Sequence, residues 1–202
     1  MEKNNDVNQS NFWENRYKKE EIGWDLGAET PVFTALSDTL DPGKVCILGC
    51  GNGYDAILFS KKGFSVTAVD FAETPIHNLE TNARSLSLSI ETIKKDIFDL
   101  TPDYSSQFDY IIEQTCFCAI DPLKREQYSN LVYDLLKVGG KLIGLWMPLD
   151  KDIDEGGPPF GVKEDEIKML FSKKWKITAD YFPNQSIEAR KGKEKLIVFE
   201  KL

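Results

Sequence analysis

Residues 44–54 read KVCILGCGNGY, and this stretch decides the fold. Its first half, residues 44–48, is a short apolar run of the kind that forms a buried strand. Glycines follow at positions 49, 51 and 53, and a helical pattern begins at Tyr54. Glycine lets the backbone turn sharply and lets a ligand approach where a Cβ would collide. A strand, a glycine loop and a helix in this order predict a ligand-binding loop in a parallel α/β fold.

The rest of the chain alternates short β-branched runs with helical stretches, which is typical of a parallel sheet. The expected elements are a strand at 44–48, a helix at 54–62, a strand at 65–69, a helix capped by Thr74-Pro75, strands near 89–93 and 108–112, a helix from Asp121-Pro122 to Gly139-Gly140 with Val138 in its apolar stripe, a strand at 141–147 and a helix near 164–171. Two last strands, 176–181 and 195–200, have no room for a crossover helix between them and should pair antiparallel. We therefore predict an α/β, Rossmann-like, seven-stranded and mostly parallel sheet with a C-terminal antiparallel hairpin and helices on both faces.

The N-terminal segment lies outside this pattern. Ser10 is placed to cap a helix that carries Trp13 and Tyr17 on one face. Thr30-Pro31 is a start signal for a second helix. We expect residues 1–40 to form a helical lid and residues 41–202 to form the ligand-binding domain, in a protein of one domain overall.

The composition bounds the partners. The 202 residues are 41% hydrophobic and 29% charged, as in an ordinary globular protein. No apolar run approaches the roughly 20 residues that a membrane-spanning helix needs, and a net charge of −8 is a poor match to nucleic acid. The first ten residues lack the apolar run of a signal peptide, and the four cysteines lack zinc-ribbon spacing. We expect a cytoplasmic monomer with reduced thiols, a small-molecule substrate and no metal, nucleic acid or membrane partner.

The spacing of the glycines bears on the ligand. A dinucleotide fingerprint has its third glycine three positions after the second, where this chain has Tyr54, and a phosphate-binding P-loop ends in Gly-Lys-Ser/Thr. The loop therefore suits a ligand without a pyrophosphate. Asp70 ends the second strand, about 20 residues further on, where a carboxylate can accept both ribose hydroxyls of an adenosine. Asp96 and Ile97, after the third strand, offer an acceptor and an apolar edge for an adenine ring.

Several segments beyond the glycine loop together carry a family resemblance. They are Trp13-Glu14 with Tyr17, residues 23–27 (GWDLG), Thr30-Pro31, residues 48–51 (LGCG), residues 117–122 (FCAIDP), residues 156–160 (GGPPF) and residues 190–195 (RKGKEK). With these segments the chain resembles the class I S-adenosylmethionine-dependent methyltransferases. Within that class it resembles the thiopurine methyltransferase family, and in that family most of all the thiol, thiocyanate and halide methyltransferases. Like that family, it lacks the acidic residue that most of the superfamily has at the position of Ile47.

The resemblance implies S-adenosyl-L-methionine as cofactor and a role for each of ten residues. Gly49 and Gly51 let the backbone reach its methionine part, Asp70 takes the ribose, Asp96 and Ile97 border the adenine, Trp13, Tyr17 and Trp24 fold over the site as an aromatic lid, Gln114 contacts the cofactor, and Arg125 orients the substrate. The aromatic residues could instead only staple the N-terminal helix to the core. Tyr17 stands where the family commonly has Trp. Gln114 stands where thiocyanate-type relatives often have an aromatic residue, which bears on substrate preference.

The chemistry implied is methyl transfer by in-line displacement, for which positioning alone supplies much of the rate. The sequence holds a single histidine, His77, on the polar side of a helix, so we expect no histidine base. A nucleophile already ionised near neutral pH fits best: a thiol, hydrosulfide, thiocyanate or halide, with Arg125 to orient it unless that arginine lies exposed. A thiopurine-type aryl-thiol methyltransferase is the alternative in the same class. A non-catalytic or NAD-binding Rossmann-like protein is the alternative outside it. Cys116 and Cys118 are expected to pack rather than react.

Overall fold

The computed structural model describes residues 6–202. The chain divides into two compact units, one ending at Asp99 and the other running from Leu100 to Leu202. Among residues 6–202 there are seven strands, three in the first unit and four in the second.

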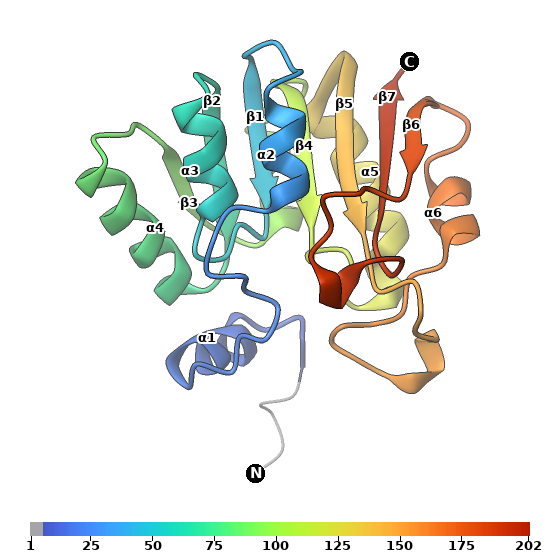
Figure 1. Cartoon of the computed structure of the whole chain (residues 1–202), viewed down its shortest axis with the longest axis horizontal. Helices are drawn as coiled ribbons and strands as arrows, with labels where there is room; N and C mark the ends of the chain where they lie inside the picture. The colour runs from blue at the N-terminus through green and yellow to red at the C-terminus, as the bar shows by residue number, and fades with distance from the viewer. Residues whose placement is uncertain (1–5) are drawn as a thin grey trace. The chain divides into compact units, whose positions relative to one another are not determined.

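The described part of the first unit, residues 6–99, contains three parallel strands and four α-helices (Figure 1). Its elements are α1 (Ser10–Lys18), α2 (Pro31–Ser37), β1 (Lys44–Leu48), α3 (Tyr54–Lys61), β2 (Ser65–Asp70), α4 (Glu73–Ser85) and β3 (Glu91–Lys94), followed by a 3-10 turn at Ile97–Asp99. β2 lies between β1 and β3 and pairs in parallel with both. α3 packs against β1 and β2, and α4 packs against β2 and β3. The loops that follow β1 and β2 therefore leave the same edge of the strands.

The second unit contains four strands and two α-helices (Figure 1). Its elements are β4 (Phe108–Gln114), α5 (Arg125–Leu135), β5 (Leu136–Trp146), α6 (Glu164–Leu170), β6 (Trp175–Tyr181) and β7 (Lys195–Lys201), with 3-10 turns at Pro122–Lys124, Ile153–Glu155 and Glu188–Arg190. β4 and β5 are parallel, whereas β7 runs antiparallel to β5 and to β6. The predicted seven-stranded, mostly parallel sheet with a C-terminal antiparallel pair is confirmed.

The end of α5 corrects one prediction. We expected Gly139-Gly140 to end this helix and Val138 to lie in its apolar stripe, but α5 ends at Leu135 and residues 136–146 form β5. Val138 is 78% exposed. The Nζ of Lys201 donates hydrogen bonds to the carbonyls of Tyr133 and Leu136, at 2.6 and 2.8 Å. A lysine from the last strand thus satisfies carbonyl groups at the helix end, which a glycine would otherwise do.

The starts of α4 and α1 correct two more predictions. Thr74 does not cap α4: the helix begins at Glu73, its N-cap residue is Ala72, and no side chain there makes a capping hydrogen bond. Ser10 is the first residue of α1 rather than its cap, and Gln9 at the N-cap makes no side-chain bond either. The start signal at Thr30-Pro31 is confirmed, since α2 begins at Pro31.

Within residues 6–202 we find no helix that combines the length and apolar character needed to cross a membrane. All four cysteines are free thiols.

Candidate functional site

The glycine loop between β1 and α3 has the backbone that its sequence predicts. Gly49, Gly51 and Gly53 have φ angles of +60°, +54° and +79°, a region that favours glycine. A Cβ on Gly53 would overlap the side chain of Leu79 in α4, so this glycine allows the two helices to pack. A Cβ on Gly51 would lie 3.1 Å from the hydroxyl oxygen of Tyr17. This loop, residues 49–53, is called the cradle here: its glycines leave the backbone without side chains, and the hydroxyl of Tyr17 covers it.

Asp70, the last residue of β2, is hydrogen-bonded to this loop. Its Oδ2 accepts a hydrogen bond from the Gly51 N–H at 3.1 Å, and its Oδ1 accepts one from the Ala72 N–H at 2.9 Å. The residue is only 7% exposed. Burial raises the pKa of Asp70 to about 6, although the backbone hydrogen bonds oppose this shift. A carboxylate oxygen has further lone pairs, so both oxygens can still accept from a ligand.

Three aromatic residues of the N-terminal segment lie together. The rings of Trp13 and Trp24 are 5.5 Å apart, and those of Tyr17 and Trp24 are 5.7 Å apart, both edge to face. Trp24 donates a hydrogen bond to the Tyr17 hydroxyl, and burial together with the charge of Asp70 raises the pKa of that hydroxyl. The Trp13 indole N–H donates to the carbonyl of Val7 at 2.9 Å. Tyr17, Gly51 and Asp70, which the sequence analysis assigned to one site, are thus brought together.

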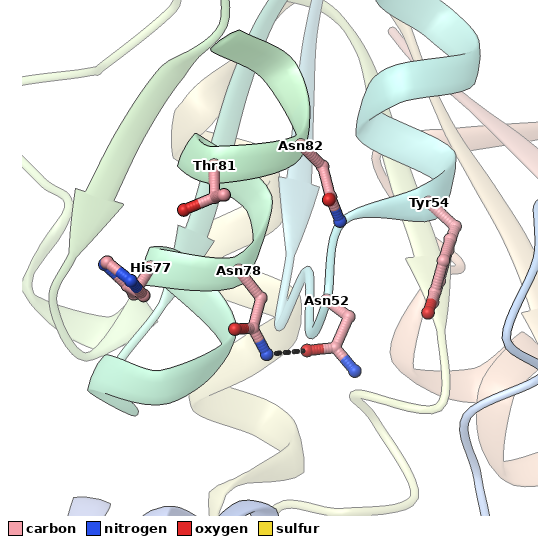
Figure 2. Close-up of a pocket in the computed structure, with 6 residues that line it drawn as sticks. All are labelled: Asn52, Tyr54, His77, Asn78, Thr81 and Asn82. Carbon is pink, nitrogen blue, oxygen red and sulfur yellow. Dashed lines mark hydrogen bonds between the residues drawn. The ribbon is translucent and has the colours of Figure 1, made fainter. Parts of the chain in front are cut away.

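A hydrogen-bond chain fixes the middle of the glycine loop. Asn52 donates from its amide to Asp25 at 2.5 Å. It accepts from the amide of Asn78, in α4, at 2.9 Å (Figure 2). The Asp25 carboxylate also accepts from the Gly27 N–H at 2.6 Å. A polar cavity of about 280 Å³ opens beside these hydrogen bonds. It is lined by Asn52, Tyr54, His77, Asn78, Thr81 and Asn82 (Figure 2). Asp25 thereby ties the segment that carries Trp24 to the loop that Tyr17 covers.

Two further latches hold the N-terminal segment in place. Glu14 in α1 accepts hydrogen bonds from the backbone N–H groups of Glu73 and Thr74, both at 2.9 Å. Asp55 in α3 accepts from the N–H and the hydroxyl of Thr30, both at 2.8 Å. Four residues of these contacts were not predicted from the sequence: Glu14, Asp25, Asn52 and Asp55. Glu14 and Asp25 lie inside the segments that carry the family resemblance, and this was the available signal.

The predicted adenine edge follows β3. The N–H of Lys95 donates to the backbone carbonyl of Asp70 at 3.1 Å, so the residues after β3 lie next to the end of β2. The Asp96 side chain accepts a hydrogen bond from the Phe98 N–H at 3.1 Å. Ile97 is 7% exposed. Asp96 and Ile97 thus stand beside Asp70, on the strand-end side of the first unit.

In the second unit, β4 ends in a tight turn built around Glu113. This carboxylate is 2% exposed and accepts hydrogen bonds from the Phe117 N–H at 2.9 Å and from the Tyr128 hydroxyl at 2.7 Å. Burial raises the pKa of Glu113 to about 7, although these bonds oppose it. Thr115 has a φ of +60°. Gln114 lies between Glu113 and Thr115, at the carboxyl end of the strand.

Arg125 lies buried in the second unit, at 2% exposure, so the expectation that it could be an exposed helix arginine is wrong. Its Nη1 is 2.7 Å from a carboxylate oxygen of Glu166, and its Nη2 donates to the carbonyl of Gly161 at 2.9 Å. Its guanidinium also lies over the Phe117 ring, 4.6 Å from the centroid. The Phe160 N–H donates to the carbonyl of Cys118 at 2.7 Å. Arg125 therefore braces the loop at 156–161 against the turn after β4.

The remaining titratable candidates are placed as structural or solvent-facing residues. His77 is exposed on α4. Cys116 and Cys118 are buried, and burial raises the pKa of Cys118 to about 12. Burial likewise raises the pKa of Cys50. A thiol needs its ionised form to react, and burial keeps Cys50 and Cys118 in the protonated form. Across residues 6–202 we find no cluster of three or more His, Cys, Asp or Glu side chains suited to a metal ion.

Comparison with known proteins places these features in one family. The family profile of thiopurine S-methyltransferase matches residues 8–201. Thiocyanate methyltransferase 1 of Arabidopsis thaliana is 32% identical over 195 residues, which cover 94% of this chain and 84% of that protein. The Arabidopsis thaliana protein named "Probable thiol methyltransferase 2" is 31% identical with the same coverage. A thiopurine S-methyltransferase of Aliivibrio fischeri is 28% identical, covering 80% of this chain and 82% of the relative.

Solved structures with lower identity share the fold. One comes from a study of the conversion of a disulfide bond into a thioacetal group during echinomycin biosynthesis. It superposes with a TM-score of 0.77 at 21% identity, and the match covers 95% of this chain and 92% of that one. The 1,6-didemethyltoxoflavin-N1-methyltransferase of Burkholderia thailandensis, solved with S-adenosylhomocysteine, has a TM-score of 0.74 at 20% identity and covers 96% and 87%.

Proposed function

The chain belongs to the thiopurine S-methyltransferase family, and from this premise we propose that it transfers a methyl group from S-adenosyl-L-methionine to a small soft nucleophile. The acceptor class is a thiol, hydrosulfide, thiocyanate or halide. The thiol and thiocyanate methyltransferases among its relatives support this choice, since they share 31–32% of their residues with it over nearly the whole chain.

The observation that carries the proposal is the Asp70 carboxylate hydrogen-bonded to the Gly51 amide beneath Tyr17. The residues present fit the cofactor. A bare backbone at Gly49 and Gly51 leaves room for its methionine part, and a buried carboxylate suits the ribose hydroxyls. Gly53 is used for packing against Leu79 rather than for a pyrophosphate. The loop therefore does not support an NAD-binding protein, and the methyltransferase relatives do not favour a non-catalytic one.

The cofactor, when bound, supplies an electrophilic methyl group on a sulfonium. The acceptor would supply the lone pair for the new bond to carbon, and the departing sulfur would keep the electron pair of the broken carbon–sulfur bond. No proton moves if the acceptor arrives as an anion. The chain fits such an acceptor, because its one histidine is exposed and burial holds Cys50 and Cys118 as thiols. Positioning then has to supply most of the rate.

The residues divide this work as follows in our proposal. Trp13, Tyr17 and Trp24 exclude water from the cofactor and present aromatic faces to its positive charge, an attraction of about 0.5–2 kcal/mol. Asp96 and Ile97 border the adenine. Gln114 and Arg125, which sequence reasoning assigned to the site, belong to the second unit. We propose that Arg125 acts indirectly, by holding the 156–161 loop, because Glu166 and Gly161 already bind its two terminal nitrogens.

The test is a substrate panel. The protein is incubated with S-adenosylmethionine and iodide, thiocyanate, hydrosulfide or an aryl thiol, and the methylated products are measured by gas chromatography of the headspace or by liquid chromatography. We expect methyl thiocyanate, methanethiol or a methyl halide. Activity on aryl thiols alone would replace our proposal with the thiopurine-type alternative, which the 28% identical bacterial relatives represent.

Calorimetric titration provides the second arm. We expect binding of S-adenosylmethionine and none of NAD. Tight NAD binding without S-adenosylmethionine binding would overturn the proposal at its cofactor. The four free cysteines support our further proposal that the protein works in a reducing compartment such as the cytoplasm. We also propose that it works as a monomer on a small-molecule substrate.

A further inference from the structure

Asn52, in the middle of the cradle, uses both ends of its side-chain amide to join the N-terminal segment to α4. Its Nδ2 donates a hydrogen bond to Oδ2 of Asp25 at 2.5 Å. Its Oδ1 accepts one from the Asn78 amide at 2.9 Å (Figure 2). A carboxylate can only accept hydrogen bonds, so this orientation of the Asn52 amide is the one that satisfies both partners. Aspartate at this position would have no donor and would lose the bond to Asp25.

The neighbours of Asn52 and Asp25 also contact each other. Trp24, which precedes Asp25, donates a hydrogen bond to the hydroxyl of Tyr17, and the two rings lie 5.7 Å apart. That hydroxyl covers Gly51, the residue before Asn52, since a Cβ on Gly51 would lie 3.1 Å from it. The contacts therefore form a closed cycle that leaves the cradle at Gly51 and returns to it at Asn52. All of these residues belong to the first unit.

The bond between Asn52 and Asp25 is complete within the protein. The Asn52 amide binds two protein groups, and the other oxygen of Asp25 accepts a hydrogen bond from the Gly27 N–H at 2.6 Å. The bond can therefore form equally well with and without a ligand on the cradle. A contact that is equally strong in two states does not shift the equilibrium between them. It does slow any motion that has to break it.

We propose that Asn52 is a positioning residue: through Asp25 it holds the aromatic lid over the cradle, and so sets how fast the cofactor enters and leaves but not how tightly it binds. This rests on the function proposed above, which places the cofactor on the cradle. Both entry and exit require the Tyr17 hydroxyl to move away from Gly51. Because Tyr17 is tied to Trp24, this motion has to disturb the closed cycle of contacts.

The other two latches explain why the affinity should be kept. Glu14 holds α1, which carries Tyr17, to the start of α4, and Asp55 holds Thr30. Both latches remain when the bond from Asn52 is lost, so the lid stays closed for most of the time but opens more often. A binding-competent state that remains the main one costs little affinity. The two rate constants therefore rise together, and their ratio, the dissociation constant, changes little.

The experiment compares the native protein with Asn52→Asp, which loses the donor and places a second carboxylate against Asp25. Asn82→Asp is the matched control, because it makes the same change at an exposed residue that lines the same cavity. The double variant Asn52→Asp with Asp25→Asn exchanges the two groups. Its amide at position 25 can donate to the carboxylate at position 52, while the amide oxygen still accepts from the Gly27 N–H.

Three quantities are measured. Stopped-flow fluorescence gives the association and dissociation rate constants of S-adenosylmethionine, calorimetry gives its dissociation constant, and hydrogen exchange follows the Gly27 amide. We expect Asn52→Asp to raise both rate constants and the exchange rate at least tenfold, and to change the dissociation constant less than threefold. Asn82→Asp and the double variant should stay within threefold of the native protein throughout. A melting curve checks that each variant is folded. Asn52→Ala, which removes the donor without adding a charge, must raise both rate constants as well.

The other outcomes decide against the inference. Native rate constants in Asn52→Asp and Asn52→Ala, or a double variant that stays as fast as Asn52→Asp, overturn it. Equal exchange of the Gly27 amide in all variants does so too. A weaker affinity that comes from faster dissociation alone makes Asn52 a cofactor contact instead. In each of these cases the native protein still binds S-adenosylmethionine and the proposed function stands. If the native protein does not bind it, the proposed function fails and this inference fails with it.

Discussion

Glu14 holds Thr74 from across the first unit. Its Oε2 accepts a hydrogen bond from the Thr74 N–H at 2.9 Å, and its Oε1 accepts one from the Thr74 hydroxyl at 2.7 Å. Because α4 has no side-chain cap of its own, this carboxylate caps the helix and also fixes α1 to it. Burial alone would raise the pKa of Glu14, but the bonds from Thr74 and Lys18 outweigh it and lower the pKa to about 2. The helix that carries Tyr17 is thus latched by a carboxylate that stays ionised.

Glu14→Ala should lower the free energy of unfolding by about 1–2 kcal/mol at pH 7, because it removes a cap and a charge at a helix N-terminus. The folded pKa of about 2 lies below the usual 4.5, so the stabilisation is complete above about pH 4.5 and is lost toward pH 2. The difference in the free energy of unfolding between the native protein and Glu14→Ala, measured by urea denaturation, should therefore become smaller from pH 5 to pH 3. Glu21→Ala, an exposed change in the same segment, should cost less than 0.5 kcal/mol, as ~0.5 kcal/mol is the usual limit at such sites. Equal costs for the two variants would contradict the cap.

Cofactor affinity should depend on the ionisation of Asp70. Its pKa is raised to about 6 by burial, so the carboxylate that accepts from a ribose is lost as the pH falls below that value. The dissociation constant of S-adenosylmethionine, measured by calorimetry, should rise by up to about tenfold for each pH unit below 6. Asp70→Asn should bind more weakly at pH 7 and show no such dependence. Parallel pH profiles for the two proteins would remove Asp70 from the site.

The same shift has the opposite effect on the free protein. The folded state holds the Asp70 proton more tightly than the unfolded state, whose pKa is near 3.8. The contribution of Asp70 to the free energy of unfolding therefore falls as the pH rises from about 4 to about 6. Thermal melts of the native protein and Asp70→Asn over this range should show a steeper fall for the native protein.

Gly51→Ala should disturb the cradle in two ways. A left-handed φ costs a residue with a side chain about 1–2 kcal/mol, and the new methyl group would meet the Tyr17 hydroxyl at 3.1 Å. Gly27→Ala is the matched control, since Gly27 has a φ of +68° with no atom within 4 Å of an added Cβ. Both variants should lose similar stability from strain, but only Gly51→Ala should weaken cofactor binding, by at least about tenfold if roughly 1.4 kcal/mol is lost. If Gly27→Ala weakens it equally, the cradle is not the binding site.

The double variant Gly51→Ala with Tyr17→Phe tests the contact itself. Removing the hydroxyl relieves the close approach, so the two changes should cost less stability together than the sum of their separate costs. Strict additivity would show that Tyr17 does not cover Gly51 in solution.

Local pattern was enough to predict where most elements lie, because strands and glycine loops are encoded by neighbours in sequence. It failed at the two helix ends that are completed from far away. Glu14 caps α4 across 59 positions, and Lys201 satisfies the Leu136 carbonyl at the end of α5 across 65 positions. Neither partner has a sequence signal at the helix that it completes. The pairs Thr74-Pro75 and Gly139-Gly140 look like local signals and were assigned these roles wrongly.

The candidate site divides in the same way. Gly51 and Asp70 could be predicted as neighbours because strand order and glycine spacing fix where a loop meets the next strand end. Tyr17 was assigned to the same site only through the family resemblance. The burial of Arg125 could not be predicted, because its partners Glu166 and Gly161 lie far away in the sequence and no local pattern links them to it. An arginine in a short polar stretch has the same local sequence whether it faces solvent or a distant carboxylate.

The burial of Arg125 yields a test of whether it touches substrate. Removing one partner of a buried pair costs most when the charge left behind is buried, so Glu166→Ala should cost about 3–5 kcal/mol and Arg125→Met less, because Glu166 is 31% exposed. Lys191→Ala, in the exposed pair with Glu188, should cost less than ~1 kcal/mol. If Arg125 only braces the 156–161 loop, Glu166→Ala and Arg125→Met should raise the acceptor KM alike. A rise confined to Arg125→Met, largest for anionic acceptors, would instead show that the guanidinium reaches the substrate.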